Sequence, residues 1–374
     1  MGATDDFFDR KKPWSWIKDN ILASYLPAYF AKISRLNQPV LIIDAFAGAG
    51  KFDDGSPGSP LIIASKAREH LRVDYTAVFV NKDKSDHEKL ASILQHFPNK
   101  DRLIAIQGDS QALLRRVADL FGQRISIFLY MDPFGMDFEF GNLLPFLNRN
   151  KESSTEILVN LNATGLHRLA GREKAKSSPD DERLLANQAR LTRTLGGDYW
   201  KPYLLSDGLD TKERELGVVE GFKHQLESTN YLEYSCACPV LEYRGSPTKY
   251  YMVFASRHPD ALVLMNEHML SSVEKFLTEQ EFQGTLFENM SWQEWRDTHD
   301  LGELVVQYVR QYPGLMRKQL WPKILIDHFM KFSESEYKKA VTKVFEAGRI
   351  QTPTARKTKR LNDECVLEPV ETLF

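Results

Sequence analysis

The sequence predicts an α/β fold built on a mainly parallel sheet, followed by a C-terminal domain of winged helix-turn-helix type. Two observations predict this organisation. Short apolar runs of strand length alternate with helical patterns along the first half of the chain, and continuous apolar strands are typical of parallel sheets covered on both faces. The second domain is predicted by three helical patterns that precede two short strands near the end of the sequence.

The first predicted element is a helix over residues 14–36, where apolar side chains recur at three- and four-residue steps. Pro39 breaks this pattern, and residues 40–45 form an apolar run that predicts a strand. Ser59 is expected to cap the next helix, with Pro60 in its first position. The alternation then predicts helices 60–71, 84–96, 110–121 and 139–149 and strands 75–80, 103–107, 125–130 and 156–161.

After the fifth strand the sequence predicts a helical insertion and then an antiparallel hairpin. The insertion covers residues 165–228 and begins with a charged, uneven stretch. The hairpin consists of residues 231–243 and 249–256, joined by the turn-like Arg244-Gly245-Ser246-Pro247. A helix over residues 259–277 follows, and a polar connector then ends a first domain of residues 1–290.

The second predicted domain covers residues 300–374 and has its own pattern. Helices are predicted over 301–312, 316–330 and 334–347, and strands over 349–352 and 363–368. The third helix of a winged helix normally enters a major groove, and the loop between its strands can meet phosphates. A protein-interaction module remains the alternative, because glutamates dilute the positive charge of the third helix. The candidate nucleic-acid-binding residues are Lys338, Lys339, Lys343, Arg356, Lys357, Lys359 and Arg360.

Composition limits the classes of function that need to be considered. The formal net charge is −2, so contact with DNA or RNA must come from a local patch. No apolar run approaches the ~18 residues of a membrane span, and no signal peptide precedes the first helix. A cytoplasmic protein without a structural metal is therefore expected. Cys236 and Cys238 share one strand face and are expected as small core residues, with a metal or redox pair as the alternative.

A glycine-rich turn, Asp44-Ala45-Phe46-Ala47-Gly48-Ala49-Gly50, follows the first strand. Glycines at this place let a ligand approach the backbone closely. A phosphate-binding P-loop needs glycine where Ala45 stands and Ser or Thr where Phe52 stands, and a dinucleotide motif needs a third glycine where Asp53 stands. The Asp-x-Phe-x-Gly-x-Gly form instead resembles the S-adenosylmethionine (SAM) motif of adenine-type amino-methyltransferases. A tight turn without a ligand is the alternative.

Polar residues also stand at the ends of the second and third strands. Asn81 occupies the position of the acid that accepts hydrogen bonds from ribose hydroxyls in dinucleotide and SAM folds, and Asp83 could substitute for it. Asp109 and Ser110 end the third strand, where the methyltransferase pattern has an acid that contacts the adenine amino group of SAM. Simple helix capping is the alternative for Asp83, Asp109 and Ser110.

The fourth strand ends in Asp132-Pro133-Phe134-Gly135. This string resembles the [DNS]-P-P-[YFW] motif of enzymes that methylate exocyclic amines, although it has one proline where the motif has two. By that resemblance Asp132 is the side-chain acceptor for the amine, the Pro133 carbonyl is the backbone acceptor, and Phe134 stacks on the base. An isolated turn is the alternative.

These motifs fall at the carboxyl ends of four successive strands, where open α/β sheets bind ligands. Together with the closing hairpin they resemble a class I SAM-dependent methyltransferase with a Rossmann-like sheet. The resemblance implies SAM as cofactor and transfer to an exocyclic amine, with adenine N6 of a nucleic acid favoured over cytosine N4. It implies catalytic roles for Asp132, Pro133 and Phe134 and cofactor contacts from Asp44, Phe46, Gly48, Gly50, Asn81, Asp83, Asp109 and Ser110.

The chain also resembles the three-Cys-motif partner protein family over most of residues 5–280. The resemblance is carried by Phe8-Asp9-x-Lys11-Lys12-Pro13-Trp14-Ser15-x-x-Lys18, Gly55-Ser56-Pro57-Gly58-Ser59-Pro60 and Tyr250-Tyr251-x-x-Phe254-Ala255-x-x-His258-Pro259, besides the motifs above. It implies a radical-SAM-like partner protein that bears a three-cysteine motif. A non-catalytic adaptor that presents nucleic acid or a nucleotide to this partner is thus the alternative function, and Asn81 favours it.

Trp14 and Lys18 lie one helical turn apart on the leading helix. In a methyltransferase this helix could cover the cofactor. The sequence pattern favours a simpler interpretation, in which Trp14 packs and Lys18 is solvated.

Overall fold

The computed structural model describes residues 13–120, 124–171, 182–243, 246–281, 300–353 and 361–370. The chain divides between His258 and Pro259 into two compact units, and each unit is described by itself. Among the described helices, none has the length and apolar character needed to cross a membrane.

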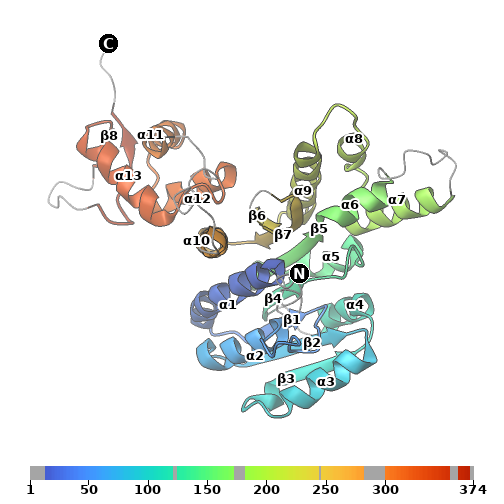
Figure 1. Cartoon of the computed structure of the whole chain (residues 1–374). Helices are drawn as coiled ribbons and strands as arrows, with labels where there is room; N and C mark the ends of the chain where they lie inside the picture. Colours follow the sequence, from blue (N-terminus) through green and yellow to red (C-terminus); the bar gives the residue numbers. More distant parts are fainter. Residues whose placement is uncertain are drawn as a thin grey trace. The chain divides into compact units, whose positions relative to one another are not determined.

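The first unit is built on a seven-stranded sheet with the order β3-β2-β1-β4-β5-β7-β6 (Figure 1). Strands β1 to β5 pair in parallel, and β7 pairs antiparallel with both β5 and β6. The predicted parallel sheet with a closing antiparallel hairpin is therefore confirmed. The strands are β1 Val40–Asp44, β2 Tyr75–Asn81, β3 Leu103–Gln107, β4 Ser126–Met131, β5 Thr155–Asn162, β6 Tyr234–Leu241 and β7 Thr248–Ser256.

Strand β1 lies inside the sheet and pairs with both β2 and β4. The chain therefore runs outward in one direction from β1 to β3 and in the other direction from β4 onward. Open α/β sheets bind ligands beside the carboxyl ends of the strands at such a switch point. The polar ends of β1, β2, β3 and β4 are brought together at this edge.

The helices of the first unit follow the predicted alternation. They are α1 Pro13–Ile33, α2 Ser59–His70, α3 Lys84–Leu94, α4 Ser110–Leu120, α5 Leu144–Leu147, α6 Ala163–Ala170, α7 Glu182–Leu195, α8 Lys201–Leu204 and α9 Thr211–Glu227, with short 3-10 turns at Ser34–Leu36, Lys100–Arg102 and Phe140–Asn142. The prediction of one helix over residues 139–149 is wrong. A 3-10 turn and the four-residue α5 stand there, because Pro145 at the start of α5 has no N–H to continue a helix through it.

The two faces of the sheet are covered differently. On one face, apolar residues of α4 to α9 pack against alternate strand residues such as Ile43, Leu129 and Val159. On the other face, the Tyr25 ring of α1 lies 6.2 Å from the Phe128 ring of β4 and 5.5 Å from the Phe254 ring of β7. Such aromatic pairs contribute about 0.5–1.5 kcal/mol each beyond their buried area. Helix α1 is thus packed on the strands that border the site.

The second unit contains α10 Pro259–Glu281, α11 Leu301–Gln311, α12 Arg317–Asp327, α13 Glu334–Glu346 and the strands β8 Ile350–Gln351 and β9 Glu368–Pro369. Its core includes the stacked Trp321 and Tyr337 rings, whose centroids are 4.6 Å apart. Asn266 of α10 donates to the Phe332 carbonyl over 2.9 Å and accepts from the Met330 N–H over 2.8 Å. These bonds join α10 to the C-terminal helices, whereas the sequence placed this helix in the domain of residues 1–290.

Three helices followed by an antiparallel pair of short strands occur in the second unit in the predicted order. The interpretation as a winged helix stays a prediction, because the loop that would form the wing is not described. Four candidate nucleic-acid-binding residues of that loop lie outside the described residues: Arg356, Lys357, Lys359 and Arg360.

The three cysteines are buried and free. Burial raises the pKa of both the Cys236 and Cys238 thiols, so they stay protonated at neutral pH. No group of three metal-binding side chains occurs among the residues that the structure describes. The prediction that Cys236 and Cys238 are small core residues is confirmed by their burial in β6.

Candidate functional site

Two adjoining cavities lie at the carboxyl ends of the central strands. The first has a volume of ≈ 370 Å³ and lies at the ends of β2 and β3, and the second has ≈ 280 Å³ and lies at the ends of β1 and β4 beside α1. Phe46 and Phe134 line both cavities. Of the predicted site residues, the first cavity also contains Asn81, Asp83, Asp109 and Ser110, and the second contains Gly48, Gly50, Asp132 and Pro133.

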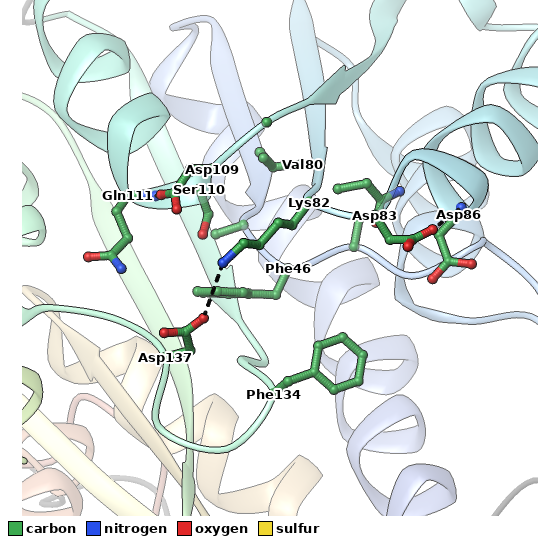
Figure 2. Close-up of a pocket in the computed structure, with 14 residues that line it drawn as sticks. Phe46, Val80, Lys82, Asp83, Asp86, Asp109, Ser110, Gln111, Phe134 and Asp137 are labelled. Carbon is green, nitrogen blue, oxygen red and sulfur yellow. Dashed lines mark hydrogen bonds and ion pairs between the residues drawn. The ribbon is translucent and has the colours of Figure 1, made fainter. Parts of the chain in front are cut away.

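Figure 2 shows Phe46 near the middle of the first cavity, with Asp109 and Ser110 on one side and Asp83 on the other. Asp83 caps α3 by accepting from the Asp86 N–H over 2.9 Å. Asp109 accepts from the Gln111 N–H at the start of α4 over 2.8 Å. Both carboxylates therefore cap helices and also line the cavity, so the capping bonds leave the predicted ligand-binding role open.

Asn81 is only 3% exposed, and its amide Nδ2 donates to the Gly48 carbonyl over 3.3 Å. This bond ties the end of β2 to the glycine-rich turn after β1. An aspartate at this position could not make it, because an ionised carboxylate has no hydrogen to donate. The departure from the acidic pattern thus has a local structural reason.

Asp44 lies beneath the turn and lines neither cavity. It is fully buried, accepts from the Ser59 hydroxyl over 2.7 Å and accepts from the Phe46 N–H over 3.3 Å. Burial raises the pKa of the Asp44 carboxyl to about 7, although these two hydrogen bonds lower it. Ser59 was expected to cap α2, but Gly58 holds the N-cap position and the Ser59 side chain holds Asp44 instead.

Glycine stands at positions 48 and 50 of the turn for two different structural reasons. Gly48 has no heavy atom within 4 Å of the place where a Cβ would stand, so a side chain there would extend into open space beside the second cavity. Gly50 has a φ of +92°, and a Cβ there would lie 3.0 Å from the Leu90 side chain. Gly48 therefore keeps space open at the second cavity, while Gly50 satisfies the backbone and the packing of α3.

An ion pair spans the first cavity. Figure 2 shows Lys82, which follows β2, directed at Asp137 after β4, and their charged atoms are 3.7 Å apart. Asp137 also pairs with Arg190 of α7 over 3.1 Å. Neither Lys82 nor Asp137 could be identified as a site residue from the sequence, because opposite charges on two separate loops form no motif. Since these side chains are partly exposed, the pairs contribute at most about 1 kcal/mol each.

The second cavity contains a partly buried ion pair. Lys18 of α1 and Asp132 after β4 are joined by a 2.6 Å bond between Nζ and Oδ2. The other Asp132 oxygen accepts from the amide of Asn160 in β5, also over 2.6 Å. Asp132 is thus positioned from two elements besides its own, and charge-assisted bonds of this length are the strong ones.

Lys18 is 7% exposed, so the prediction of a solvated lysine is wrong. Burial lowers the pKa of its ammonium, but the charge and hydrogen bond of Asp132 outweigh burial and leave the pKa above its ordinary value. Its Nζ lies 4.7 Å from the centroid of the Tyr250 ring, which contributes a cation–π contact. Lys18, Asn160 and Tyr250 are site residues that no strand-end motif contains.

Phe134 is 85% exposed at the junction of the two cavities. The following residue, Gly135, has a φ of +71°, which turns the chain sharply after the buried Pro133. A large ring held in water has no packing explanation. Its position next to Asp132 suits the predicted role of stacking on a planar acceptor.

In the second unit, Lys338 of α13 pairs with Glu334 over 2.7 Å and lies 3.7 Å from Asp363. Lys339 and Lys343 are exposed one helical turn apart on the same helix. Of the three predicted lysines, these two present the more open positive charge.

The chain was compared with known proteins. No protein-family model and no curated protein matches it. Solved structures that match part of the chain include an O-methyltransferase from Bacillus cereus in complex with SAH, at 11% identity and a TM-score of 0.34 over 62% of this chain and 79% of that one. An O-methyltransferase of tomaymycin synthesis from Streptomyces achromogenes in complex with SAM has 12% identity and a TM-score of 0.33 over 64% and 80%.

Fibrillarin from Aeropyrum pernix with bound SAM has 10% identity and a TM-score of 0.31, and the match covers 65% of this chain and 76% of fibrillarin. At such identities and TM-scores the function of this chain has to be inferred from its own residues. The resemblance to the three-Cys-motif partner family stays a prediction.

Proposed function

We propose that the chain is a SAM-dependent methyltransferase that acts on an exocyclic amine. The observation that carries this proposal is the pair of cavities that meet at Phe46 and Phe134, one lined by strand-end acids and the other by Asp132. We place the nucleoside in the first cavity, where Asp83 and Asp109 can accept hydrogen bonds from ribose hydroxyls and from an adenine amino group. The second cavity then receives the methionine half and the acceptor.

Bound SAM supplies a methyl group on an electrophilic sulfonium. The residues of the chain hold the acceptor for it. Asp132 and the Pro133 carbonyl accept the two N–H groups of the amine, which favours a pyramidal nitrogen with a free lone pair, and Phe134 stacks on the ring. Position and approach supply most of the rate in such a site, and Asp132 can take the proton that the nitrogen loses after methylation.

A nucleic-acid base is the favoured acceptor, with adenine N6 ahead of cytosine N4. The 85% exposed ring of Phe134 offers a stacking surface that a base can reach only when it leaves a duplex. The acceptor is therefore a single-stranded or flipped base.

The test is calorimetric titration of the full chain with SAM and with S-adenosylhomocysteine, followed by transfer of labelled methyl to DNA and RNA oligonucleotides. We expect both ligands to bind below millimolar concentration and the label to appear on adenine. Absence of heat with both ligands would contradict the proposal at its first step.

Changing Asn81 to aspartate is expected to weaken SAM binding about 10- to 100-fold, although an acid is the usual residue at this place. The new carboxylate could not donate to the Gly48 carbonyl. Its oxygen and the carbonyl oxygen, both acceptors, would then face each other where the present side chain is only 3% exposed. Buried polar groups without a partner cost about 1–3 kcal/mol. Calorimetry measures the change, with Asp83→Asn as the comparison. Tighter binding in Asn81→Asp would show that the Gly48 bond is unimportant.

A second candidate function is binding without transfer, as an adaptor for a radical-SAM-like protein with a three-cysteine motif. The specific observation that favours it is that both oxygens of Asp132 already accept hydrogen bonds, from Lys18 and Asn160. The adaptor function predicts that SAM or a nucleotide binds while no oligonucleotide is labelled. Methyl transfer that depends on Asp132 would exclude it.

For the second unit we propose nucleic-acid contact through α13. Lys339→Ala/Lys343→Ala is expected to weaken DNA or RNA binding by the full chain and to reduce its dependence on salt, because each lost phosphate contact lowers the log–log slope by about 0.9 for duplex DNA. Lys66→Ala, a lysine change on α2, is the control. Gel-shift titration across salt concentrations measures both quantities, and a slope that stays the same in the double variant would favour protein docking instead.

A further inference from the structure

The second cavity places a hydrogen-bond donor and an acceptor side by side. Lys18 Nζ and Asp132 Oδ2 are 2.6 Å apart, and both residues line the cavity. We infer that this pair recognises a base edge on which an exocyclic amine stands beside a ring nitrogen without hydrogen, as in adenine or cytosine. Lys18 is then a specificity-determining residue of the acceptor site. The inference rests on the proposed function.

The capacity of the two groups fits this role. A lysine ammonium has three N–H donors and a carboxylate has about four lone-pair sites. The bond between Lys18 and Asp132 uses one of each, and the amide of Asn160 uses a second site on the carboxylate. Donors and acceptors therefore remain for a ligand, so the amine can donate to Asp132 while the ring nitrogen accepts from Lys18 without breaking the ion pair.

The pair is held in place before any base binds. Asn160 fixes one carboxylate oxygen over 2.6 Å, and Tyr250 holds its ring 4.7 Å from the ammonium. Lys18 is almost fully buried, while the Asp132 side chain keeps 27% of its surface exposed. A pair fixed in this way loses little freedom on binding, and parallel hydrogen bonds to a planar partner add geometric specificity.

The same geometry rejects other edges. Uracil and thymine carry a ring N–H and a carbonyl on this edge, so the N–H points at the ammonium when the ring takes the orientation of adenine. Two donors would then face each other, and a charged donor without an acceptor is costly in a buried site. A plain aromatic amine could still donate to Asp132 but would leave Lys18 without its second partner. Lys18 thus requires a ring nitrogen that accepts a hydrogen bond beside the amine, and Asp132 alone does not require it.

The experiment compares an oligonucleotide that carries one adenine with the same strand carrying 1-deazaadenine, in which carbon replaces the ring nitrogen and the amine stays. The full-length protein, Lys18→Met, Lys18→Arg and the control Lys66→Met are assayed for kcat/KM of labelled methyl transfer. SAM affinity and thermal unfolding are measured for each protein. If cytosine is the better acceptor, 3-deazacytosine takes the place of 1-deazaadenine.

For the unchanged protein we expect the deaza base to react about 10- to 100-fold more slowly, the size of one hydrogen bond to a charged group. Lys18→Met should lower transfer to adenine by a similar factor and lose the difference between the two bases. Lys18→Arg should restore part of the difference, and Lys66→Met should behave like the unchanged protein.

Equal reaction of the two bases with the unchanged protein would overturn the inference, and this comparison needs no variant to fold. Full discrimination by a folded Lys18→Met would overturn it as well, since Lys18 would then only position Asp132. If SAM binds but neither base is methylated, the proposed function fails. Calorimetry then measures the affinity of the protein for the nucleosides of adenine and 1-deazaadenine in the presence of S-adenosylhomocysteine, independently of methyl transfer. Equal affinities would reject the role of Lys18.

Discussion

Replacing Asp132 with alanine is expected to lower methyl transfer about 100- to 1,000-fold and to destabilise the protein by about 3 kcal/mol. The rate falls because the amine loses its side-chain acceptor, and removal of one positioned polar group has an effect of this size in other active sites. The stability falls because Lys18, 7% exposed, keeps its charge without its partner. Breaking a buried pair costs about 3–5 kcal/mol, and the partial exposure of Asp132 places this site at the lower end.

Asp132→Asn is the matched variant. Its amide oxygen can still accept from Lys18 or from the amine, so we expect most of the stability and a larger share of the transfer to remain than in Asp132→Ala. Urea unfolding and labelled transfer measure the two effects separately, and calorimetry checks that SAM still binds. Transfer at the original rate in Asp132→Ala would refute the role given to this carboxylate.

Changing Glu156 to glutamine is expected to remove a large part of the pH dependence of stability. Glu156 is 6% exposed beneath α1 and accepts from the Tyr25 hydroxyl over 2.5 Å. Burial raises the pKa of this carboxyl from 4.5 to about 8, although the Tyr25 bond and the charge of Lys32 lower it. The folded protein therefore keeps a proton that the unfolded chain releases at lower pH.

The direction of the pH dependence follows from the higher pKa of Glu156 in the folded protein than in the unfolded chain. The stability contributed by protonated Glu156 is fully present below pH 4.5, decreases as the pH rises toward about 8 and is constant above it. The loss across this window is about 5 kcal/mol by linkage. Glutamine stays neutral and can still accept from Tyr25, so the variant should become more stable than the unchanged protein as the pH rises.

Urea unfolding at a series of pH values measures this effect. Glu152→Gln is the control, because Glu152 is exposed and pairs with Arg124 at the surface over 3.3 Å. The unfolding free energy of Glu156→Gln relative to the unchanged protein should rise between pH 5 and pH 8, while that of Glu152→Gln should stay nearly level. Parallel pH curves for the Glu156 variant and the unchanged protein would mean that Glu156 is already ionised in the folded state.

Much of the fold could be predicted because its information is local. The apolar run over residues 103–107 predicts β3 with the bounds that the structure has, and the predictions for β1, β2, β4, β5 and β7 differ from it by one residue at one or both ends. The predictions over residues 231–243 and 363–368 begin three residues before β6 and five residues before β9. Helix prediction failed over residues 139–149, where Pro145 restarts the chain after a 3-10 turn. The spacing of apolar residues does not show that a proline without an N–H interrupts the helix.

Some residues of the candidate site could also be predicted from the sequence, and others could not. Asn81, Asp109 and Asp132 could be predicted because the ends of parallel strands meet at one edge of a sheet. Lys18 and Asn160 could not, because they come from a leading helix and from the middle of a strand, and only tertiary packing brings them to Asp132. For Asp44 the sequence predicted a cofactor contact that the structure does not show. Its carboxylate instead accepts hydrogen bonds from the Ser59 hydroxyl and from the Phe46 N–H of the turn.

Helix α1 has a consequence for the order in which the molecule forms. Its side-chain bonds to the sheet close very long loops, since Lys18 meets Asp132 across 114 residues and Tyr25 meets Glu156 across 131. The entropy of closing such loops must be overcome before these contacts stabilise anything, so contacts of this separation slow folding. During synthesis α1 leaves the ribosome before the strands of the sheet, yet its bonds to Asp132 and Glu156 can form only after β4 and β5 have been made. Helix α1 therefore reaches its place on the sheet only after β5 has been made, although it precedes every strand in the chain, and its docking brings Lys18 to Asp132.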